Sequence, residues 1–386
     1  MKKISVFGAT GSVGSNACKL ILENLSNYNT KVLTANKNFK KLALYSRLLS
    51  SEYAVIKDKK FYKPLKEELS GTKVKCLSGY DEIASLASIK TDIFISAIVG
   101  IAGLKATYEC IGNTKILALA NKESLVCSGR ILMKKAKKLN TKILPLDSEH
   151  NALYQIMEKE NIASIKNIIL TASGGPFWNK NINLKNVSVK EALKHPNWNM
   201  GKKISIDSAT MMNKVLEKVE AAILFGIDFK KINILVHPSS IVHGIVNYID
   251  GNSQMLASKP DMKLPINYAL NWPKRTELKI NNINLKNIKS LNFFDINTKL
   301  FPSLKLFKYM NNTKTLDSTL IVINVANEVA VDSFLNEEIK FLDINKIIEK
   351  TIGKINHKKV KNLSDVFEIN QDASTIAHNL VNKLRL

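Results

Sequence analysis

Three glycines between an apolar strand and an amphipathic helix place the strongest constraint on how this chain can fold. Gly8, Gly11 and Gly14 separate the apolar run Ile4–Phe7 from a helical pattern that continues to about Leu25. Glycines in this position allow a tight turn and let a pyrophosphate approach the positive amino end of the helix. A lone glycine-rich turn is weak evidence. Here, however, a strand precedes the turn and a helix follows it, as in dinucleotide-binding folds. We therefore expect residues 8–14 to bind a dinucleotide.

The segments that follow alternate between buried-type strands and helix-like stretches. This alternation is typical of an α/β fold with a doubly wound, mostly parallel sheet, in which ligands bind beyond the carboxyl ends of the strands. The predicted strands are Lys31–Thr34, Lys73–Leu77, Asp92–Ile98, Ile116–Ala120 and Ile143–Leu146.

The residues after the second predicted strand indicate which dinucleotide binds. A site for NAD often carries an acidic residue here, which binds the ribose 2′-hydroxyl. This chain instead has Asn36, Lys37 and Asn38. Lysine and asparagine suit a 2′-phosphate, so we expect NADPH.

Two later strand ends carry polar clusters, Asn121-Lys122-Glu123 and Asp147-Ser148-Glu149-His150. Asp147 and Glu149 are two residues apart where a strand gives way to a helix, so their carboxylates can converge on one cation. The alternative is an ordinary helix N-cap followed by acidic residues in the first turn. His150 could belong to the same functional site, face solvent, or cap the helix.

The stretch 207–220 supplies a further set of polar side chains. Asp207 and Ser208 are good N-cap residues, and Gly226 is a plausible C-cap, so we expect one helix between them. Asn213, Lys214 and Glu217 then project within one polar sector. They could hold a phosphorylated, polyhydroxylated substrate, although an ordinary solvated helix face would have the same pattern.

Glu217 completes an all-oxygen set with Asp147 and Glu149. Three carboxylates suit Mg²⁺ or Mn²⁺ better than zinc, which prefers nitrogen and sulfur ligands. We therefore expect a divalent metal ion.

Two loops are candidates for holding the substrate. Thr171–Pro176 follows the apolar strand Ile165–Leu170, and its small residues, Ser173 among them, suit a phosphate cradle or a plain turn. His195–Gly201 carries aromatic and sulfur side chains that suit either a closing lid or a packed connector.

The remaining segments concern architecture. Leu235–Ile249 and Asn252–Leu256 are expected to form a β-hairpin through Asp250-Gly251, whose apolar face suits a dimer interface. We expect structural positions for His237 and His243, of which His243 is the better candidate for a site residue. A lysine- and asparagine-rich linker starts near Thr276. Helical stretches follow at Ser303–Tyr309, Leu320–Leu335, Ile344–Ile355 and Ala373–Leu384.

Composition narrows the function classes. The 386 residues have a hydrophobic fraction of 45%, and no apolar run approaches the roughly 20 residues of a membrane span. The four cysteines show no CxxC spacing, and a strand-like run begins almost at Met1, so we expect a cytoplasmic protein without a leader and with reduced thiols. The net charge of +24 arises from scattered lysines without an arginine-rich arm, so we expect neither a nucleic-acid nor a membrane partner.

The chain carries, in this order, the motifs GATGSVG, Lys37-Asn38, ALANKESLV, PLDSEHNALYQ, LTASGGPF, HPNWNMGKKISIDSATMMNKVLE and PDMKLPINYALNWP. In these motifs, and in the later ANEVAVDSFL, it resembles the 1-deoxy-D-xylulose 5-phosphate reductoisomerase family of the methylerythritol phosphate pathway. The resemblance implies a homodimer of three-part chains. Its parts are a Rossmann-like NADPH domain over 1–146, a catalytic α+β domain over 147–275 with a flexible lid at 195–201 and, after a linker at 276–295, a helical domain over 296–386. It also implies metal-dependent rearrangement of 1-deoxy-D-xylulose 5-phosphate and reduction to 2-C-methyl-D-erythritol 4-phosphate.

The resemblance also implies roles for individual residues. The expected catalytic residues are Lys122, Asp147, Glu149 and Glu217, of which the three carboxylates bind the metal. The expected substrate contacts are Lys122, Ser148, Glu149, His150, Ser173, His195, Trp198, Met200, Ser208, Asn213, Lys214 and Glu217. The expected cofactor contacts are Gly8, Thr10, Gly11, Ser12, Val13, Asn36, Lys37, Asn38, Asn121, Glu123 and Gly201.

One position departs from the family pattern. Asn36 stands where many members carry glycine, which raises the question of how the 2′-phosphate fits.

Three other hypotheses for the function can be compared with that of a reductoisomerase. They are a basic nucleic-acid-binding protein, a silent relative that keeps only nucleotide binding, and an NADPH-dependent reductase of another phosphorylated sugar.

Overall fold

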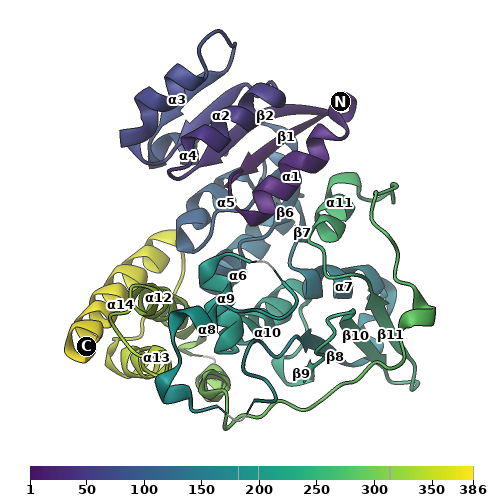
Figure 1. Cartoon of the computed structure of the whole chain (residues 1–386), viewed down its shortest axis with the longest axis vertical. Helices are drawn as coiled ribbons and strands as arrows, with labels where there is room; N and C mark the ends of the chain where they lie inside the picture. Colours follow the sequence, from purple (N-terminus) through teal and green to yellow (C-terminus); the bar gives the residue numbers. More distant parts are fainter. Residues whose placement is uncertain (181, 199, 313, 386) are drawn as a thin grey trace. The chain divides into compact units, whose positions relative to one another are not determined.

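The computed structural model describes residues 1–180, 182–198, 200–312 and 314–385. The chain divides into two compact units (Figure 1). Unit 1 comprises Met1–Ser124, Leu132–Tyr154 and Asp261–Asn281, and unit 2 comprises Leu125–Ile131, Gln155–Pro260 and Asn282–Leu386. The division into domains over 1–146, 147–275 and 296–386, with a linker between the last two, stays a prediction.

Unit 1 is built on a seven-stranded parallel sheet in the order β4-β3-β2-β1-β5-β6-β7. The expected doubly wound α/β fold is confirmed. Sequence reasoning missed β3, which is only four residues long. The strands are β1 (Lys2–Phe7), β2 (Tyr28–Ala35), β3 (Tyr53–Ile56), β4 (Lys75–Ser78), β5 (Thr91–Ser96), β6 (Thr114–Leu119) and β7 (Lys142–Pro145).

The helices that accompany this sheet follow the strands in turn along the chain. They are α1 (Ser12–Leu22), α2 (Phe39–Leu48), α3 (Tyr62–Glu68), α4 (Tyr80–Leu86), α5 (Leu104–Cys110), α6 (Lys122–Lys138) and α7 (Ser148–Ile156), with short 3-10 helices at Leu25–Asn27, Lys59–Phe61 and Ile101–Gly103. The middle of α6 and the end of α7 belong to unit 2.

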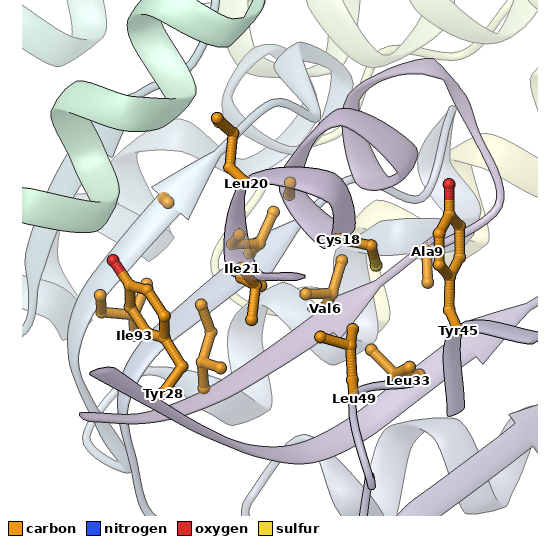
Figure 2. Close-up of a cluster of buried hydrophobic side chains, with 14 of the residues drawn as sticks. Val6, Ala9, Cys18, Leu20, Ile21, Tyr28, Leu33, Tyr45, Leu49 and Ile93 are labelled. Carbon is orange, nitrogen blue, oxygen red and sulfur yellow. The ribbon is translucent and has the colours of Figure 1, made fainter. Parts of the chain in front are cut away.

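The core of unit 1 forms between α1 and the sheet. Figure 2 shows Cys18 and Ile21 of α1 beside Val6 and Leu33 of the strands, and all four side chains are fully buried. Burial of an aliphatic side chain of this size contributes about 1.5–3 kcal/mol to folding. The same burial raises the pKa of the Cys18 thiol to about 12. The four cysteines are free thiols, as expected.

A helix from much later in the sequence completes this core. Ile266, Ala269 and Leu270 of α11 (Lys263–Asn271) are buried in the same cluster as the side chains of α1. Lys2 Nζ donates a hydrogen bond of 3.0 Å to the carbonyl oxygen of Leu270. The segment after residue 260 therefore stabilises the sheet that the amino-terminal residues build.

Unit 2 contains a four-stranded sheet in the order β11-β10-β8-β9. Its strands are β8 (Ile165–Ala172), β9 (Ile232–Val236), β10 (Val242–Tyr248) and β11 (Ser253–Ala257). The hairpin of β10 and β11 is confirmed, with Gly251 at φ +91° in its turn. The prediction of one strand over 235–249 is wrong. The chain turns at Pro238–Ser239, Ser240 has φ +51°, and β9 pairs parallel with β8.

The helices of unit 2 include a carboxy-terminal bundle. They are α8 (Val189–Ala192), α9 (Lys202–Ala209), α10 (Met212–Phe225), α12 (Leu316–Leu335), α13 (Asp343–Lys354) and α14 (Leu363–Leu384), with 3-10 helices at Lys159–Ser164, Leu184–Asn186, Phe229–Lys231, Leu285–Asn287 and Pro302–Asn311. By length and composition α12 could cross a membrane, contrary to the expectation that no such run exists. However, 83% of its apolar window is buried inside the structure, which is typical of a core helix.

The prediction of one helix starting at Asp207-Ser208 is wrong. Both residues lie in the last turn of α9, and Met211 then adopts a left-handed conformation with φ +62° before α10 begins. Sequence reasoning missed this break because Met211 and Met212 fit the apolar spacing of a continuous helix. The predicted C-cap at Gly226 is confirmed, with φ +66°.

We expect Gly8→Ala to unfold or strongly destabilise unit 1. Gly8 has φ +92°, and a Cβ there would lie 2.4 Å from the backbone oxygen of Ala97. Together the strain and the clash should lower the free energy of unfolding by about 2 kcal/mol or more. Gly11→Ala is the control, because φ at Gly11 is −73° and its Cβ would make an ordinary contact of 3.5 Å. Equal thermal stability of the two variants would contradict this account.

Candidate active site

The glycine turn lies where the strand order of the unit 1 sheet reverses. After β1 the chain adds strands on one side through β2 and on the other through β5, and ligands bind in such crevices. The backbone nitrogen of Gly8 donates to Thr34 Oγ1 at 2.9 Å, and a Cβ on Gly14 would lie 2.2 Å from the oxygen of Gly8. The N-cap residue of α1 is Gly11, which offers no capping side chain, and both Gly11 and Ser12 are exposed. These features fit a pyrophosphate.

The neighbouring residues of this turn complete the predicted cofactor contacts. Thr10 and Val13 are half-buried on either side of the exposed Gly11-Ser12 pair. The carbonyl oxygen of Thr10 accepts a hydrogen bond of 3.3 Å from Lys41 Nζ, which brings a positive charge to the turn.

The residues after β2 are exposed at the same edge of the sheet. Asn38 caps α2 by accepting a hydrogen bond of 3.1 Å from the backbone of Lys41. Asn36 does not have a positive φ, so its backbone does not require glycine. Its carbonyl oxygen accepts a hydrogen bond of 3.1 Å from the backbone of Asp58. Asn36, Lys37 and Asn38 therefore present exposed side chains on an ordered backbone.

Asn121 has a structural role that the sequence did not reveal. Its side chain is buried, donates to the carbonyl oxygens of Ile98 and, at 2.8 Å, Gly100, and accepts from the backbone of Ser124 at 2.7 Å. The amide thus joins the loop after β5 to the start of α6. The next two residues, Lys122 and Glu123, are each only 5% exposed.

Lys122 and His150 both contact Asp147. Lys122 Nζ lies 2.9 Å from one carboxylate oxygen of Asp147, and His150 Nδ1 lies 3.0 Å from the other. His150 is fully buried, so a solvent-facing position is wrong for it. The backbone of Glu149 also donates to Asp147 at 3.3 Å, as expected of a carboxylate ahead of a helix. Asp147 therefore has both a helix-capping and an ion-pair role.

The carboxylate of Glu149 lies one residue further along α7. It accepts a hydrogen bond from the hydroxyl group of Ser148, and both residues are half-buried. Unit 1 therefore brings Lys122, Asp147, Ser148, Glu149 and His150 together at the carboxyl ends of β6 and β7.

In unit 2, the first turns of α10 bring Asn213, Lys214 and Glu217 together. Glu217 is completely buried, and Lys214 is 5% exposed, so the interpretation as a solvated helix face is wrong for these two residues. Lys214 Nζ lies 2.5 Å from one carboxylate oxygen of Glu217, and the Asn213 amide donates to the other. A buried carboxylate is thereby neutralised and held in place.

Ser173 and His195 form a polar pair in unit 2. His195 Nδ1 accepts from the backbone nitrogens of Asn197 at 3.2 Å and Trp198 at 2.9 Å. The proton of the neutral ring is therefore on Nε2, which donates to Ser173 Oγ at 2.9 Å. The backbone of Gly175 also donates to Ser173 Oγ at 3.2 Å. With both bonds accepted, the Ser173 hydroxyl group can still donate its proton to a further acceptor, as a phosphate cradle requires.

The predicted lid is attached to the turn between β9 and β10 through a residue that sequence reasoning did not single out. Asn197 Nδ2 donates to the carbonyl oxygen of Pro238 at 2.6 Å and to Ser240 Oγ at 2.8 Å. The Trp198 and His243 rings meet edge to face at 6.2 Å. Met200 is half-buried and Gly201 precedes α9 as its exposed N-cap residue, whereas Asn199 lies outside the described residues.

Ser208 lies beside the Ser173 loop. A Cβ on Gly175 would lie 2.8 Å from the carbonyl oxygen of Ser208, so the loop and the end of α9 are in close contact. Unit 2 thus gathers Ser173, His195, Ser208 and the polar start of α10. His237 is fully buried and bonded to the carbonyl oxygen of Asn292 at 2.8 Å, which fits the structural role we expected.

Three family models match most of the chain. They are described as 1-deoxy-D-xylulose 5-phosphate reductoisomerase, over residues 4–129, its C-terminal domain, over 143–225, and the DXP reductoisomerase C-terminal domain, over 257–376.

Full-length relatives and solved structures are also similar. A 1-deoxy-D-xylulose 5-phosphate reductoisomerase of Wolbachia pipientis subsp. Culex pipiens is 45% identical over 99% of this chain and 98% of its own length. The enzyme of Zymomonas mobilis in complex with NADPH is 40% identical with a TM-score of 0.91, over 98% of this chain and 99% of that one. A DOX-P reductoisomerase with NADPH, fosmidomycin and magnesium is 35% identical with a TM-score of 0.92, over 99% of this chain and 98% of that one.

We expect His195→Phe to loosen the base of the predicted lid. Without Nδ1, the amides of Asn197 and Trp198 lose their acceptor, which costs about 1–3 kcal/mol where such groups are buried. Proteolysis within residues 195–201 should therefore accelerate. Ser173→Ala is the control, because it removes a bond to Nε2 and leaves both bonds to Nδ1 in place. Equal protease resistance in the two variants would contradict this role of the ring.

Proposed function

This chain belongs to the 1-deoxy-D-xylulose 5-phosphate reductoisomerase family, and we propose that it rearranges and reduces 1-deoxy-D-xylulose 5-phosphate to 2-C-methyl-D-erythritol 4-phosphate. The observation that carries the proposal is similarity over the full length, 45% identity across 384 residues, in a chain that keeps Asp147, Glu149, Glu217 and Lys214. The enzyme is an NADP-dependent oxidoreductase that also isomerises its substrate.

NADPH binds at the glycine turn of unit 1 in this proposal. Gly8, Thr10, Gly11, Ser12 and Val13 hold the pyrophosphate at the amino end of α1, where the helix dipole favours negative charge. Asn36, Lys37 and Asn38 hold the 2′-phosphate. Two further segments contribute contacts to the cofactor, through Asn121, Glu123 and Gly201.

The divalent ion, Mg²⁺ or Mn²⁺, is bound by Asp147, Glu149 and Glu217. Three carboxylates fit such an ion in charge and in ligand type. Lys122 holds Asp147, and Asn213 and Lys214 hold Glu217, so each carboxylate has a fixed position within its own unit. When bound, the ion supplies Lewis acidity toward the carbonyl and hydroxyl oxygens of the substrate.

The phosphate of the sugar is held by Ser173, Ser208, Asn213 and Lys214. The Ser173 hydroxyl group donates outward because its oxygen already accepts from His195 and Gly175. Lys214 is buried, so its charge interacts strongly with a bound anion. These contacts with the phosphate supply binding energy that orients the reacting end of the substrate.

The reacting end of the substrate lies near Lys122, Ser148, Glu149 and His150 in this proposal. His195, Trp198 and Met200 cover it and exclude water. Exclusion of water protects the aldehyde that the carbon-skeleton rearrangement produces, until hydride from NADPH reduces it.

We further propose a cytoplasmic homodimer without nucleic-acid or membrane partners. The β-hairpin of unit 2 supports the dimer, because β11 is an edge strand whose Met255 is 49% exposed and the neighbouring Ile249 is 71% exposed. Exposed apolar side chains along a sheet edge favour pairing with a second copy. Four free cysteines fit a reducing compartment.

The deciding experiment follows NADPH absorbance when the protein is mixed with 1-deoxy-D-xylulose 5-phosphate. We expect oxidation with Mg²⁺ or Mn²⁺ and none after chelation. Glu217→Gln should lose turnover and keep its affinity for NADPH. The substitution removes the negative charge of a proposed metal ligand and leaves the glycine turn unchanged. No oxidation by a protein that binds NADPH tightly would point to another phosphosugar or to a silent relative.

Lys214→Met should raise the KM for the phosphosugar by about 10- to 100-fold, since a hydrogen bond between charged groups contributes about 1.5–3 kcal/mol. Lys218→Met is a matched control one turn further along α10. Lys218 Nζ lies 4.4 Å from the ring centroid of Phe229 and 4.9 Å from that of Phe307, so its role is in packing. An unchanged KM in Lys214→Met, or an equal rise in both variants, would exclude Lys214 from the phosphate site.

A further inference from the structure

A buried ion pair lies near the end of α9, outside the residues assigned to the reaction. Asp207 is 1% exposed. One of its carboxylate oxygens lies 2.7 Å from Lys203 Nζ, one turn earlier on α9. The other accepts a hydrogen bond of 2.8 Å from Asn327 Nδ2. Asn327 is completely buried and belongs to α12, 120 residues further along the chain.

The two partners of Asp207 compensate different costs of burial. A carboxylate removed from water needs an opposite charge and donors for its lone pairs. Lys203 supplies the charge from within α9, so the Lys203–Asp207 ion pair itself does not join α9 to another element. The Asn327 amide donates from the carboxy-terminal bundle and therefore holds the end of α9 against α12.

Asp207 is followed at once by the turn that connects α9 to α10. Ser208 comes next, and its carbonyl oxygen accepts from the backbone of Met211 at 3.1 Å. Met211 has φ +62°, a conformation that costs free energy for a residue with a side chain and persists only where its surroundings impose it. The backbone nitrogen of Lys214 in turn donates to the carbonyl oxygen of Met211 at 3.1 Å. The positions of Ser208 and Lys214 thus depend on this turn.

We propose that Asn327 is a positioning residue for the phosphate end of the substrate site. Through Asp207 it fixes the carboxyl end of α9, and with it the turn at 208–211 that sets Ser208 and Lys214 at a definite separation. This inference rests on the proposed function, in which both residues hold the phosphate. It extends the site to the bundle of α12, which contributes no residue to the predicted substrate contacts.

The same helix offers a matched control. Asn324 lies one turn before Asn327 on α12, is equally buried, and donates to Glu328 Oε1 at 2.8 Å, within α12 itself. In both residues the side-chain oxygen is buried without a hydrogen-bond partner. Replacing either asparagine with leucine removes a buried amide and one hydrogen bond, but only Asn327→Leu breaks the bond to α9.

Steady-state kinetics of the full-length enzyme test the proposal. Asn327→Leu should raise the KM for 1-deoxy-D-xylulose 5-phosphate about tenfold, the effect of losing one hydrogen bond to a charged group. The KM for NADPH should not change. Asn324→Leu should lower the melting temperature to a similar extent and leave both KM values unchanged. Equal effects of the two variants on the KM for the phosphosugar would overturn the positioning role.

Exchanging the partners separates the hydrogen bond from the general packing. In Asp207→Asn/Asn327→Asp an amide on α9 can donate to a carboxylate on α12. In Asn327→Asp alone, two carboxylates face each other and the KM for the phosphosugar should rise. The exchange should therefore bring this KM most of the way back to the native value. No recovery would indicate that the bond itself does not position the turn.

Hydrogen exchange of the backbone gives a readout without substrate. Amides 208–214 should exchange faster in Asn327→Leu than in Asn324→Leu or the native chain. Unchanged exchange would overturn the proposal whatever the enzyme catalyses. Failure of the proposed function has a different signature, because the native chain would then not oxidise NADPH with this substrate.

Discussion

Compensation of buried negative charge is the constraint on which the polar clusters of both units depend. Asp147, Glu217 and Asp207 are largely or completely buried, and each lies within 3 Å of a lysine ammonium group, on Lys122, Lys214 and Lys203 respectively. Removing one partner of such a pair typically costs about 3–5 kcal/mol, because a buried charge is left unpaired. The carboxylates are therefore held in fixed orientations before any ligand arrives.

Fixed carboxylates are useful for catalysis only on a backbone that is equally fixed. The structure meets this need with conformations that few residues adopt. Gly8 and Gly175 have positive φ and no room for a Cβ, and Met211 has a positive φ despite its side chain. Each lies next to residues proposed to bind phosphate. Such backbone strain is typical of sites that are organised before ligand binding, because the surrounding packing imposes it.

The sequence predicted the alternating strands and helices of the parallel sheet, and it missed the features that depend on contacts between distant residues. Strand and helix alternation identified the parallel sheet, because buried strands have continuous apolar runs. The break at Met211 left no signal, since its side chain fits the apolar spacing of one long helix. The bond between Asn327 and Asp207 joins residues 120 positions apart, and a single sequence contains nothing that pairs them. For His150 the sequence left a site, a solvent-facing or a capping position open, and only the structure shows that its side chain is fully buried.

The total lysine content says little about function, because lysines in different environments have different effects. Lys122 and Lys214, which we propose contact the substrate, are each 5% exposed, so their charges act at low dielectric and are screened little by salt. Lys115, by contrast, has a side chain that is 80% exposed and pairs with Asp92 at the surface. Surface pairs of this kind typically contribute about 0–1 kcal/mol. A net charge of +24 can therefore accumulate on the surface with little effect on a site whose electrostatics depend on a few enclosed ion pairs.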